Sequence, residues 1–337
     1  MFDTEPFTDE QVDRAVALAC DATVRSYSHA EEGSDRIAVA TLTDDRRVVL
    51  KAPELVDPER FRPEPRLAAL VDRETDVPVP TVHHVGEDGP IDGPWFVMAH
   101  VDGENWENRA SEFPDDGHER LVREAGHNLG QLHGISHFDG FGRVGVDGSG
   151  ALRVDEPRPD WREWFHELAH GKLDRMSDGP FDDLLPACRR ELDRLADAVP
   201  RDVRPAPAHT DYRLGNLLVD PDAPPDDAVT RAVIDWGNTY TAHGEFDLAK
   251  TADFLFGWED VPADRQATLL ETLYGAYAAE TGVDRDAAFR ARQHAYRLVT
   301  RLAGMEGVPF WFADGSDAQA AAETRHRAFL RDRYDIA

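Results

Sequence analysis

The chain contains very little lysine for a protein of its size. Only Lys51, Lys172 and Lys250 are lysines among 37 basic residues, whereas Asp and Glu together number 66. The formal net charge is -29 and the pI is near 4.7. We therefore expect no nucleic-acid partner, because binding to nucleic acid depends on clustered cationic side chains that meet phosphates.

Cysteines and long apolar runs are also scarce. Cys20 and Cys188 are too few for a disulfide framework, and neither lies at a metal-ligand spacing. No window approaches 18 apolar residues, and the first residues have no basic segment followed by an apolar one. We therefore expect a soluble, cytoplasmic protein without a membrane segment. No pattern in the sequence indicates its oligomeric state.

The hydrophobic pattern changes near residue 102. Before this point, apolar runs at 37–42 and 48–50 predict a β-hairpin with its turn at Asp44-Asp45, and a capping-box pattern at 8–11 predicts a first helix. After it, apolar residues recur mainly at helical spacing. The 337 residues, 41% of them hydrophobic, suffice for two lobes. We predict an α+β chain with a small antiparallel-sheet lobe, 1–101, and a larger, mainly helical lobe, 102–337.

Polar residues with a distinctive spacing frame two short apolar segments. Asp211 and Asn216 precede the segment 217–219, and the segment 232–234 is followed by Asp235. A hairpin of these two segments would place Asp235 beside Asn216, and two such oxygen ligands plus substrate phosphates commonly hold Mg²⁺. Asp211 could then accept the proton of an attacking hydroxyl. These groups are what phosphoryl transfer from ATP requires.

Lys51 is a further candidate for this chemistry. It ends the apolar run 48–50, in a chain whose other basic residues are almost all Arg. A retained lysine indicates that a compact, pointlike positive charge is needed at that position.

These motifs resemble those of the aminoglycoside phosphotransferase and choline kinase-like family, which has the bilobal protein-kinase-like fold. The resemblance is specific from His209 to Asp247 and extends in element order over nearly the whole chain. It implies that Asp211 is the catalytic base and that Asn216 and Asp235 bind magnesium. Asp247 is implied to anchor the helical lobe.

Two positions depart from the family pattern. Thr210 stands where the family commonly has Gly, and Trp236 stands where kinases have the Phe of Asp-Phe-Gly. Both are small departures from the motif.

The resemblance also implies how the N-terminal lobe would hold ATP. Lys51 would contact the α- and β-phosphates and pair with a helical Glu. Glu64 is the best positioned partner, although Glu54, Glu59 and Glu74 compete with it.

Phosphate and adenine contacts are implied at two further segments. Gly33 and Ser34 lie where the family has its short phosphate-covering loop. In the passage 95–103, Met98 would lie at the back of the adenine pocket, and the carbonyl of Ala99 and the amide of Val101 would bond the base.

Three functions remain open at this stage. The first is an ATP- and Mg²⁺-dependent kinase that phosphorylates a hydroxyl of a small molecule. A protein kinase is disfavoured because twelve positions separate Asp235 from Asp247, which leaves no room for an activation loop. A catalytically inactive pseudokinase that binds nucleotide is disfavoured because Lys51, Asp211 and the two metal-site residues are all present. No motif identifies the substrate.

The acid excess with little lysine is typical of proteins that work in concentrated salt, and this generates a prediction. The screening length falls from about 8 Å at 0.15 M to about 3 Å at 1 M salt, so salt damps the repulsion between surface acids. We expect the melting temperature, followed by circular dichroism, to rise strongly between about 0.1 M and about 3 M KCl. An unchanged melting temperature would contradict this halophilic interpretation.

Overall fold

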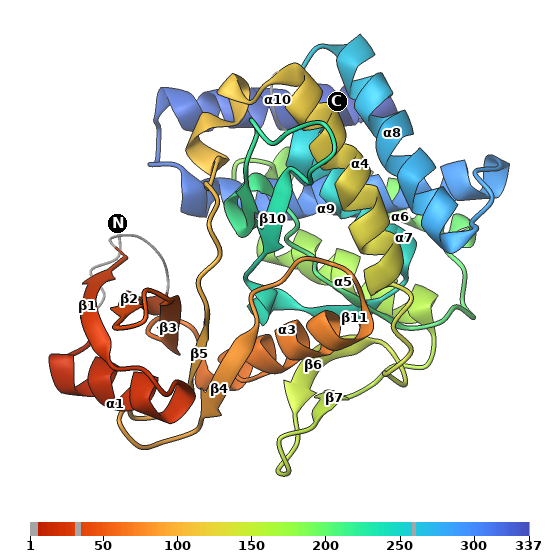
Figure 1. The fold of residues 1–337 in the computed structure, drawn as a ribbon. Coiled ribbons are helices and arrows are strands. Elements are labelled where there is room, and N and C mark those ends of the chain that lie inside the picture. Colours follow the sequence, from red (N-terminus) through yellow and green to blue (C-terminus); the bar gives the residue numbers. More distant parts are fainter. Residues whose placement is uncertain (1–5, 31–34, 258–260, 337) are drawn as a thin grey trace. The chain divides into compact units, whose positions relative to one another are not determined.

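The computed structural model describes residues 6–30, 35–257 and 261–336 (Figure 1). The chain divides into two compact units, which we name the sheet unit and the helical unit. The sheet unit comprises Met1–Glu124, Arg143–Asp155 and Arg213–Thr239, and the helical unit comprises Ala125–Gly142, Glu156–Tyr212 and Tyr240–Ala337. The lobe boundary between residues 101 and 102 stays a prediction.

The sheet unit contains a five-stranded antiparallel sheet in the order β1-β2-β3-β5-β4. Its strands are β1 (Val24–His29), β2 (Asp35–Leu42), β3 (Arg47–Pro53), β4 (Val82–Gly86) and β5 (Trp95–Ala99). The predicted hairpin is confirmed, because β2 pairs with β3 and Asp45 has the positive φ of 68° that a tight turn favours.

Helix α1 (Asp9–Ala19) covers apolar residues of this sheet. The predicted capping box is present, since Thr8 accepts a hydrogen bond from the amide of Gln11 and the Gln11 side chain accepts one from the amide of Thr8. The apolar stripe of α1 is fully buried and belongs to one hydrophobic cluster with residues of β2, β3 and β5. The cluster includes Val12, Ala15, Val16, Leu42, Leu50 and Val97.

The rest of the sheet unit consists of short elements. They are α2 (Pro58–Phe61), α3 (Pro63–Glu74), the 3₁₀ turns Glu107–Glu112, Leu214–Asn216 and Trp236–Asn238, and the strands β6 (Gly142–Val146), β7 (Leu152–Val154), β9 (Leu217–Val219) and β10 (Thr230–Val233). The predicted hairpin between the two apolar segments is confirmed, because β9 and β10 pair antiparallel. Strand β10 ends one residue earlier than predicted, at Val233.

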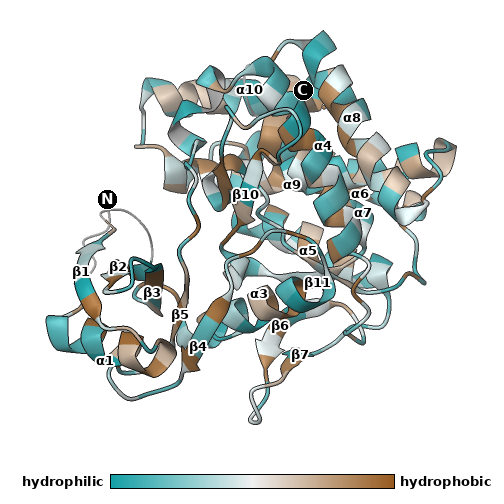
Figure 2. Cartoon of the chain, viewed as in Figure 1, coloured by the Kyte–Doolittle hydropathy of each residue, from teal (hydrophilic) through white to brown (hydrophobic). Residues whose placement is uncertain are grey.

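The helical unit is built on helices that carry both teal and brown segments in Figure 2. They are α5 (Trp161–Arg175), α6 (Leu185–Leu195), α7 (Gly244–Ala252), α8 (Ala263–Thr281), α9 (Ala287–Trp311) and α10 (Asp317–Tyr334); α4 (Asp115–Leu132) contributes residues to both units. A short pair of strands, β8 (Ala206–Ala208) and β11 (Tyr240–Ala242), is antiparallel. Within the described ranges, no helix is long and apolar enough to cross a membrane.

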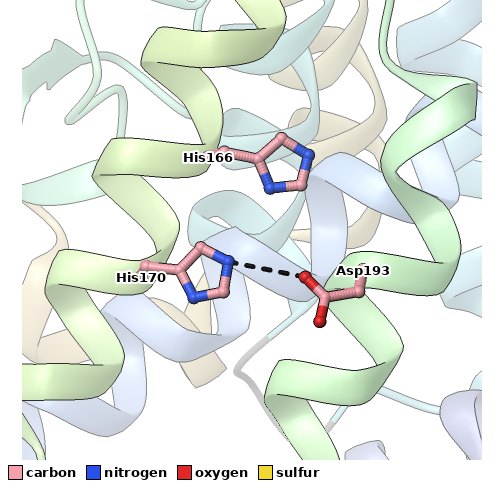
Figure 3. Close-up of side chains that lie close together, drawn as sticks. All are labelled: His166, His170 and Asp193. Atoms are coloured by element: carbon pink, nitrogen blue, oxygen red, sulfur yellow. Dashed lines mark ion pairs between the residues drawn. The ribbon is translucent and has the colours of Figure 1, made fainter.

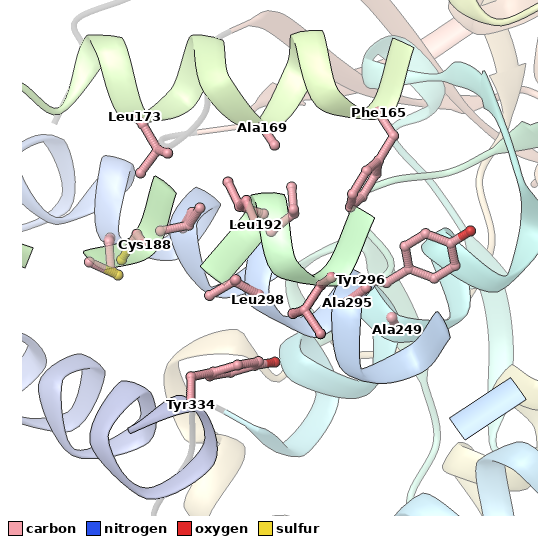
Figure 4. Packing of buried hydrophobic residues seen from close by; sticks show 14 of the residues in the cluster. Phe165, Ala169, Leu173, Cys188, Leu192, Ala249, Ala295, Tyr296, Leu298 and Tyr334 are labelled. Atoms are coloured by element: carbon pink, nitrogen blue, oxygen red, sulfur yellow. The ribbon is translucent and has the colours of Figure 1, made fainter. Parts of the chain in front are cut away.

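Helix α9 lies at the centre of the helical unit's hydrophobic core, and residues of α5, α6, α7 and α10 pack around it (Figure 4). Tyr296 of α9 and Trp161 of α5 are both fully buried, and the Trp161 indole donates a hydrogen bond of 2.9 Å to the Tyr296 hydroxyl. Cys188 of α6 is also fully buried in this core. Cys188 is therefore a core residue.

Candidate active site

Lys51 on β3 lies at the centre of a buried charged cluster in the sheet unit. Its Nζ is 2.7 Å and 2.9 Å from the two carboxylate oxygens of Glu64 on α3. It is also 3.1 Å from Asp35 Oδ2 and 3.6 Å from Asp235 Oδ1. The side chains of Lys51 and Glu64 are each 7% exposed, whereas that of Asp235 is 49% exposed. The structure thus brings together three residues that the sequence singled out separately.

The prolines that flank Glu64 do not disturb this arrangement. Pro63 and Pro65 lie in the first turn of α3, where the backbone amides have no helical partner and proline is tolerated. Glu64 therefore has a helical conformation from the start of α3 and reaches Lys51 across the sheet face.

Asp35 was not predicted to belong to the site. Ile37 on β2 pairs directly with Lys51, so Asp35 is a diagonal neighbour of Lys51 on the same face of the sheet. The contact could not be predicted, because Asp35 lies within the segment expected to cover the phosphates and before the expected strand 37–42.

The cluster contains more negative than positive charge. Burial acts to lower the pKa of Lys51, but Glu64, Asp235 and Asp35 outweigh it and hold that pKa above its usual value. Burial raises the pKa of the Glu64 carboxyl and of the Asp35 carboxyl, against the opposing effect of Lys51. Because three carboxyl groups share one ammonium group, the cluster favours an additional cation or a proton.

The β9–β10 hairpin places Asn216 and Asp235 close together in the sheet unit. Leu217 pairs with Val233, and the amide of Ile234 donates a hydrogen bond of 3.0 Å to the backbone carbonyl of Asn216. Asn216 is 4% exposed, and Asp235 has the left-handed conformation φ 63°, ψ 67°. Such strained backbone occurs often at functional sites, where surrounding contacts hold it.

The segment that leads into Asn216 is held by polar contacts within the same unit. Asn105 Nδ2 donates a hydrogen bond of 2.6 Å to the carbonyl of Gly215, and Arg213 forms an ion pair with Glu107. A Cβ atom at position 215 would collide with Glu107 and Arg213. These are the ends of flexible side chains, so both would have to shift to admit a Cβ atom at position 215.

Asp211 belongs to the helical unit and follows a tightly hydrogen-bonded turn. Its backbone amide donates a hydrogen bond of 3.3 Å to Nδ1 of the fully buried His209. The amides of His209 and Thr210 each donate a hydrogen bond of 2.8 Å to the carboxylate of Asp247, which is 0% exposed. Nε2 of His133 lies 3.3 Å from the same carboxylate. Asp247 on α7 thus anchors the segment that carries Asp211.

The anchoring Asp247 is held in its charged form. Burial acts to raise the pKa of Asp247, but the contact with His133 and the hydrogen bond from Thr210 outweigh it, so the pKa lies below its usual value. Thr210 has a φ of 61°, which is rare for a β-branched residue and costs about 1–3 kcal/mol. This explains why glycine would suit position 210, where the chain departs from the family pattern.

Lys250, on α7, was not singled out from the sequence for the site. Burial lowers the pKa of its ammonium group to about 8, and the nearby charge of Asp211 opposes that effect. A lysine whose pKa is lowered close to a candidate base is a feature that functional sites often show. Because the chain has only three lysines, the presence of a lysine at position 250 was the signal in the sequence that could have indicated a special role.

The remaining predicted nucleotide residues lie in or near the sheet unit. Met98 and Ala99 on β5 pair with Val49 and Val48 of β3, and the Ala99 amide donates to Thr81. Val101 follows β5 outside any regular element. Gly33 and Ser34 lie outside the described residues. The roles assigned to all of these residues, and to the candidate catalytic and metal residues, stay predictions.

The chain matches the phosphotransferase enzyme family, abbreviated APH, over residues 28–289. Because this is more than half of its length, the chain belongs to that family, and the predicted family is confirmed. No curated protein sequence matches the chain.

Solved structures with the same fold cover nearly the whole chain. A putative fructosamine-3-kinase from Thermobifida fusca has 23% identity and a TM-score of 0.63, with 96% of this chain and 100% of that chain covered. An aminoglycoside 2'-phosphotransferase-IIIa has 13% identity and a TM-score of 0.60, with 95% and 99% covered. A macrolide 2'-phosphotransferase from Brachybacterium faecium has 18% identity and a TM-score of 0.59, with 93% and 96% covered. The predicted α+β, bilobal protein-kinase-like fold class is therefore confirmed.

The charged cluster predicts the behaviour of a Lys51→Met variant. Removing the ammonium leaves buried carboxyl groups without a partner, and we expect a loss of about 3–5 kcal/mol in stability at pH 8. Burial keeps the pKa of Glu64 above its unfolded value, so the folded variant binds a proton more tightly and loses stability as the pH rises through that pKa. Denaturant unfolding at pH 5 and pH 8 should therefore show a smaller loss at pH 5.

Lys172→Met is the matched control for this experiment. Lys172 lies 3.1 Å from Glu306, but Glu306 also pairs with Arg175 and keeps that partner in the variant. We expect a loss below about 1 kcal/mol with little pH dependence. An equal loss of stability in both variants would contradict the view that Lys51 compensates buried carboxyl groups.

The anchor at Asp247 generates a second prediction. In Asp247→Asn, the side-chain amide can accept only one of the two backbone hydrogen bonds, and we expect a loss of about 1–3 kcal/mol in stability. Hydrogen exchange should become faster at the amides of His209 and Thr210. Asp314→Asn, at an exposed position, should leave both measurements unchanged; unaltered exchange in Asp247→Asn would exclude the anchoring role.

Proposed function

We propose that this protein is an ATP- and Mg²⁺-dependent phosphotransferase that phosphorylates a hydroxyl of a small molecule. The observation that carries the proposal is the buried cluster of Lys51 with Glu64 and the half-exposed Asp235. A lysine held in this way by a helical glutamate is the group that positions nucleotide phosphates in kinases. Residues 1–101 are proposed as the nucleotide-binding lobe, and residues 102–337 as the lobe that carries Asp211.

The residues of the β9–β10 hairpin fit a magnesium ion. Asn216 and Asp235 offer amide and carboxylate oxygens, which are the hard ligands that Mg²⁺ prefers, and it takes few protein ligands. The surplus negative charge around Lys51 supports the binding of a cation here. Mg²⁺ held by these two residues would neutralise charge on the nucleotide phosphates.

Asp211 is proposed as the group that accepts the proton of the attacking hydroxyl. Its backbone amide is held by His209, and the preceding turn by Asp247, so the backbone that carries its carboxylate has a defined position within the helical unit. Lys250 lies in the same unit and its charge interacts with that of Asp211, so it could help to position this carboxylate.

Related structures support a nucleotide and a small hydroxyl-bearing substrate. An aminoglycoside 2'-phosphotransferase-IIIa has been solved with GDP, and another structure of this kind contains GDP and kanamycin. The structural relatives include kinases named for fructosamine, aminoglycosides and macrolides. Because these substrates differ widely, we propose the reaction and leave the substrate as a small molecule with a reactive hydroxyl.

Turnover of ATP against a panel of small hydroxyl compounds tests this proposal. In Asp211→Asn we expect kcat to fall about 10²–10⁴-fold with little change in the KM for ATP, because a general base acts on the chemical step. In Asp235→Asn we expect the affinity for Mg²⁺-ATP to fall as well. Asp222→Asn, at an exposed position in the β9–β10 loop, is the control and should retain full activity.

Two outcomes would contradict the assignments separately. Equal turnover in the wild type and in Asp211→Asn would exclude the catalytic role of Asp211. Full Mg²⁺-ATP affinity in Asp235→Asn would exclude the metal role of Asp235.

A further inference from the structure

A cluster of metal-binding side chains lies in the helical unit, on elements that the proposed phosphotransfer does not use. His166 and His170 are on α5, and Asp193 is on α6 (Figure 3). One donor atom from each residue lies within 4.8 Å of the donors of the other two. Among the described residues, this is the group of His, Cys, Asp and Glu side chains whose donor atoms are arranged to hold one metal ion.

The two histidines share one face of α5 because they are four residues apart, one helical turn. Their rings are nearly parallel, with an interplanar angle of 21° and a centroid separation of 5.9 Å. Nε2 of His170 faces Asp193, and lies 3.7 Å from its Oδ1 (Figure 3). Helix geometry and the packing of α6 against α5 therefore direct all three side chains to one region.

The spacing of the donors suits a tetrahedral transition-metal ion after small side-chain rotations. Metal–ligand bonds of about 2.0–2.1 Å place the donors of a tetrahedral site about 3.3 Å apart. The observed limit of 4.8 Å exceeds this by about 1.5 Å, which rotation about the side-chain torsions can supply. Asp193 is 69% exposed and can move freely toward the histidines.

The two ring nitrogens of His166 have different surroundings. Its Nε2 is buried and has no hydrogen-bond partner within the described ranges. This nitrogen points away from His170 and Asp193, and the other ring nitrogen, Nδ1, faces them and is the one available to the cluster (Figure 3).

The cluster is also accessible from solvent. His166 and His170 line a surface groove together with Arg162, Glu163, Glu167 and Arg201. An ion could therefore enter without unfolding the unit, and water could occupy its remaining coordination position.

Three arginines near the cluster oppose a cation, and each forms an ion pair with a carboxylate; the partner of Arg201 is Asp160, at 2.6 Å. Arg162 donates to the carboxylate of Asp197, at 3.1 Å, and Arg189 donates to that of Asp174, at 2.6 Å. Arg189 also lies 3.4 Å from Nδ1 of His170. By donating there, Arg189 favours the tautomer that has its proton on Nε2, and so competes with a metal for that nitrogen.

We propose that His166, His170 and Asp193 form a site for a Zn²⁺-like transition-metal ion that links α5 to α6. Two imidazoles and one carboxylate are a ligand set that zinc accepts, whereas magnesium prefers oxygen ligands. The ion for this site is therefore distinct from the Mg²⁺ proposed for the nucleotide. Because α5 and α6 both contribute to the core of the helical unit, the ion would stabilise that unit by binding only its folded state.

The test is a titration of the full-length, tag-free chain with Zn²⁺ against a chromophoric chelator, in KCl that keeps it folded. We expect one ion per chain and an increase in melting temperature that EDTA reverses. His166→Gln and His170→Gln should each weaken the binding at least about tenfold. His127→Gln is the matched control, because His127 also has a carboxylate neighbour, Glu280 at 3.4 Å, but belongs to no group of three potential ligands among the described residues.

Arg189→Gln separates metal binding from a merely structural effect. Because Arg189 competes for His170 and repels a cation, its removal should tighten Zn²⁺ binding, whereas loss of a structural contact would not. Bound Co²⁺ should show the visible absorption of a tetrahedral site without the thiolate bands that coordination by Cys20 or Cys188 would add. Unchanged affinity in both His166→Gln and His170→Gln, or no stoichiometric binding at all, would overturn the proposal.

Discussion

The need to compensate the buried charge of Lys51 is the constraint on which the sheet unit depends. An ammonium that is almost fully buried is stable only beside carboxylates, and Lys51 obtains them from β2, from α3 and from the end of the β9–β10 hairpin. The same contacts therefore fix three separate elements around one atom. A second buried charge, Asp247, has the corresponding position in the helical unit, where it fixes the turn before Asp211.

Both anchors are accompanied by strained backbone. Asp235 and Thr210 have left-handed conformations, and each lies at or next to a candidate functional residue. The hydrogen bonds and ion pairs around them offset this strain, which allows side chains to point where ordinary strand geometry would not direct them. Pre-organisation of this kind is what phosphoryl transfer demands, because positioning and electrostatics supply most of its catalysis.

Much of the fold and of the candidate site could be predicted from the sequence, because these features depend on patterns among residues close together in the chain. Capping at Thr8, the alternation in β2 and β3, and the hairpin before Asp235 all depend on neighbours within a few residues. The partner of Lys51 could be narrowed to a few glutamates, and the structure shows the pair with Glu64. Asp35 escaped prediction because its contact depends on the exact start and register of a strand, which are the least certain features of a pattern.

The sequence by itself determined the family, the fold class and the candidate residues of phosphoryl transfer, because motif spacing and hydrophobic periodicity are local properties. Only the tertiary structure decided that Asp35 joins Lys51, that His133 contacts Asp247, and that two histidines of α5 meet a carboxylate of α6. These contacts join residues far apart in the chain. These contacts form only if the strands pair in the right register and the helices pack in the right way. Neither condition can be deduced from the identity of the contacting residues alone.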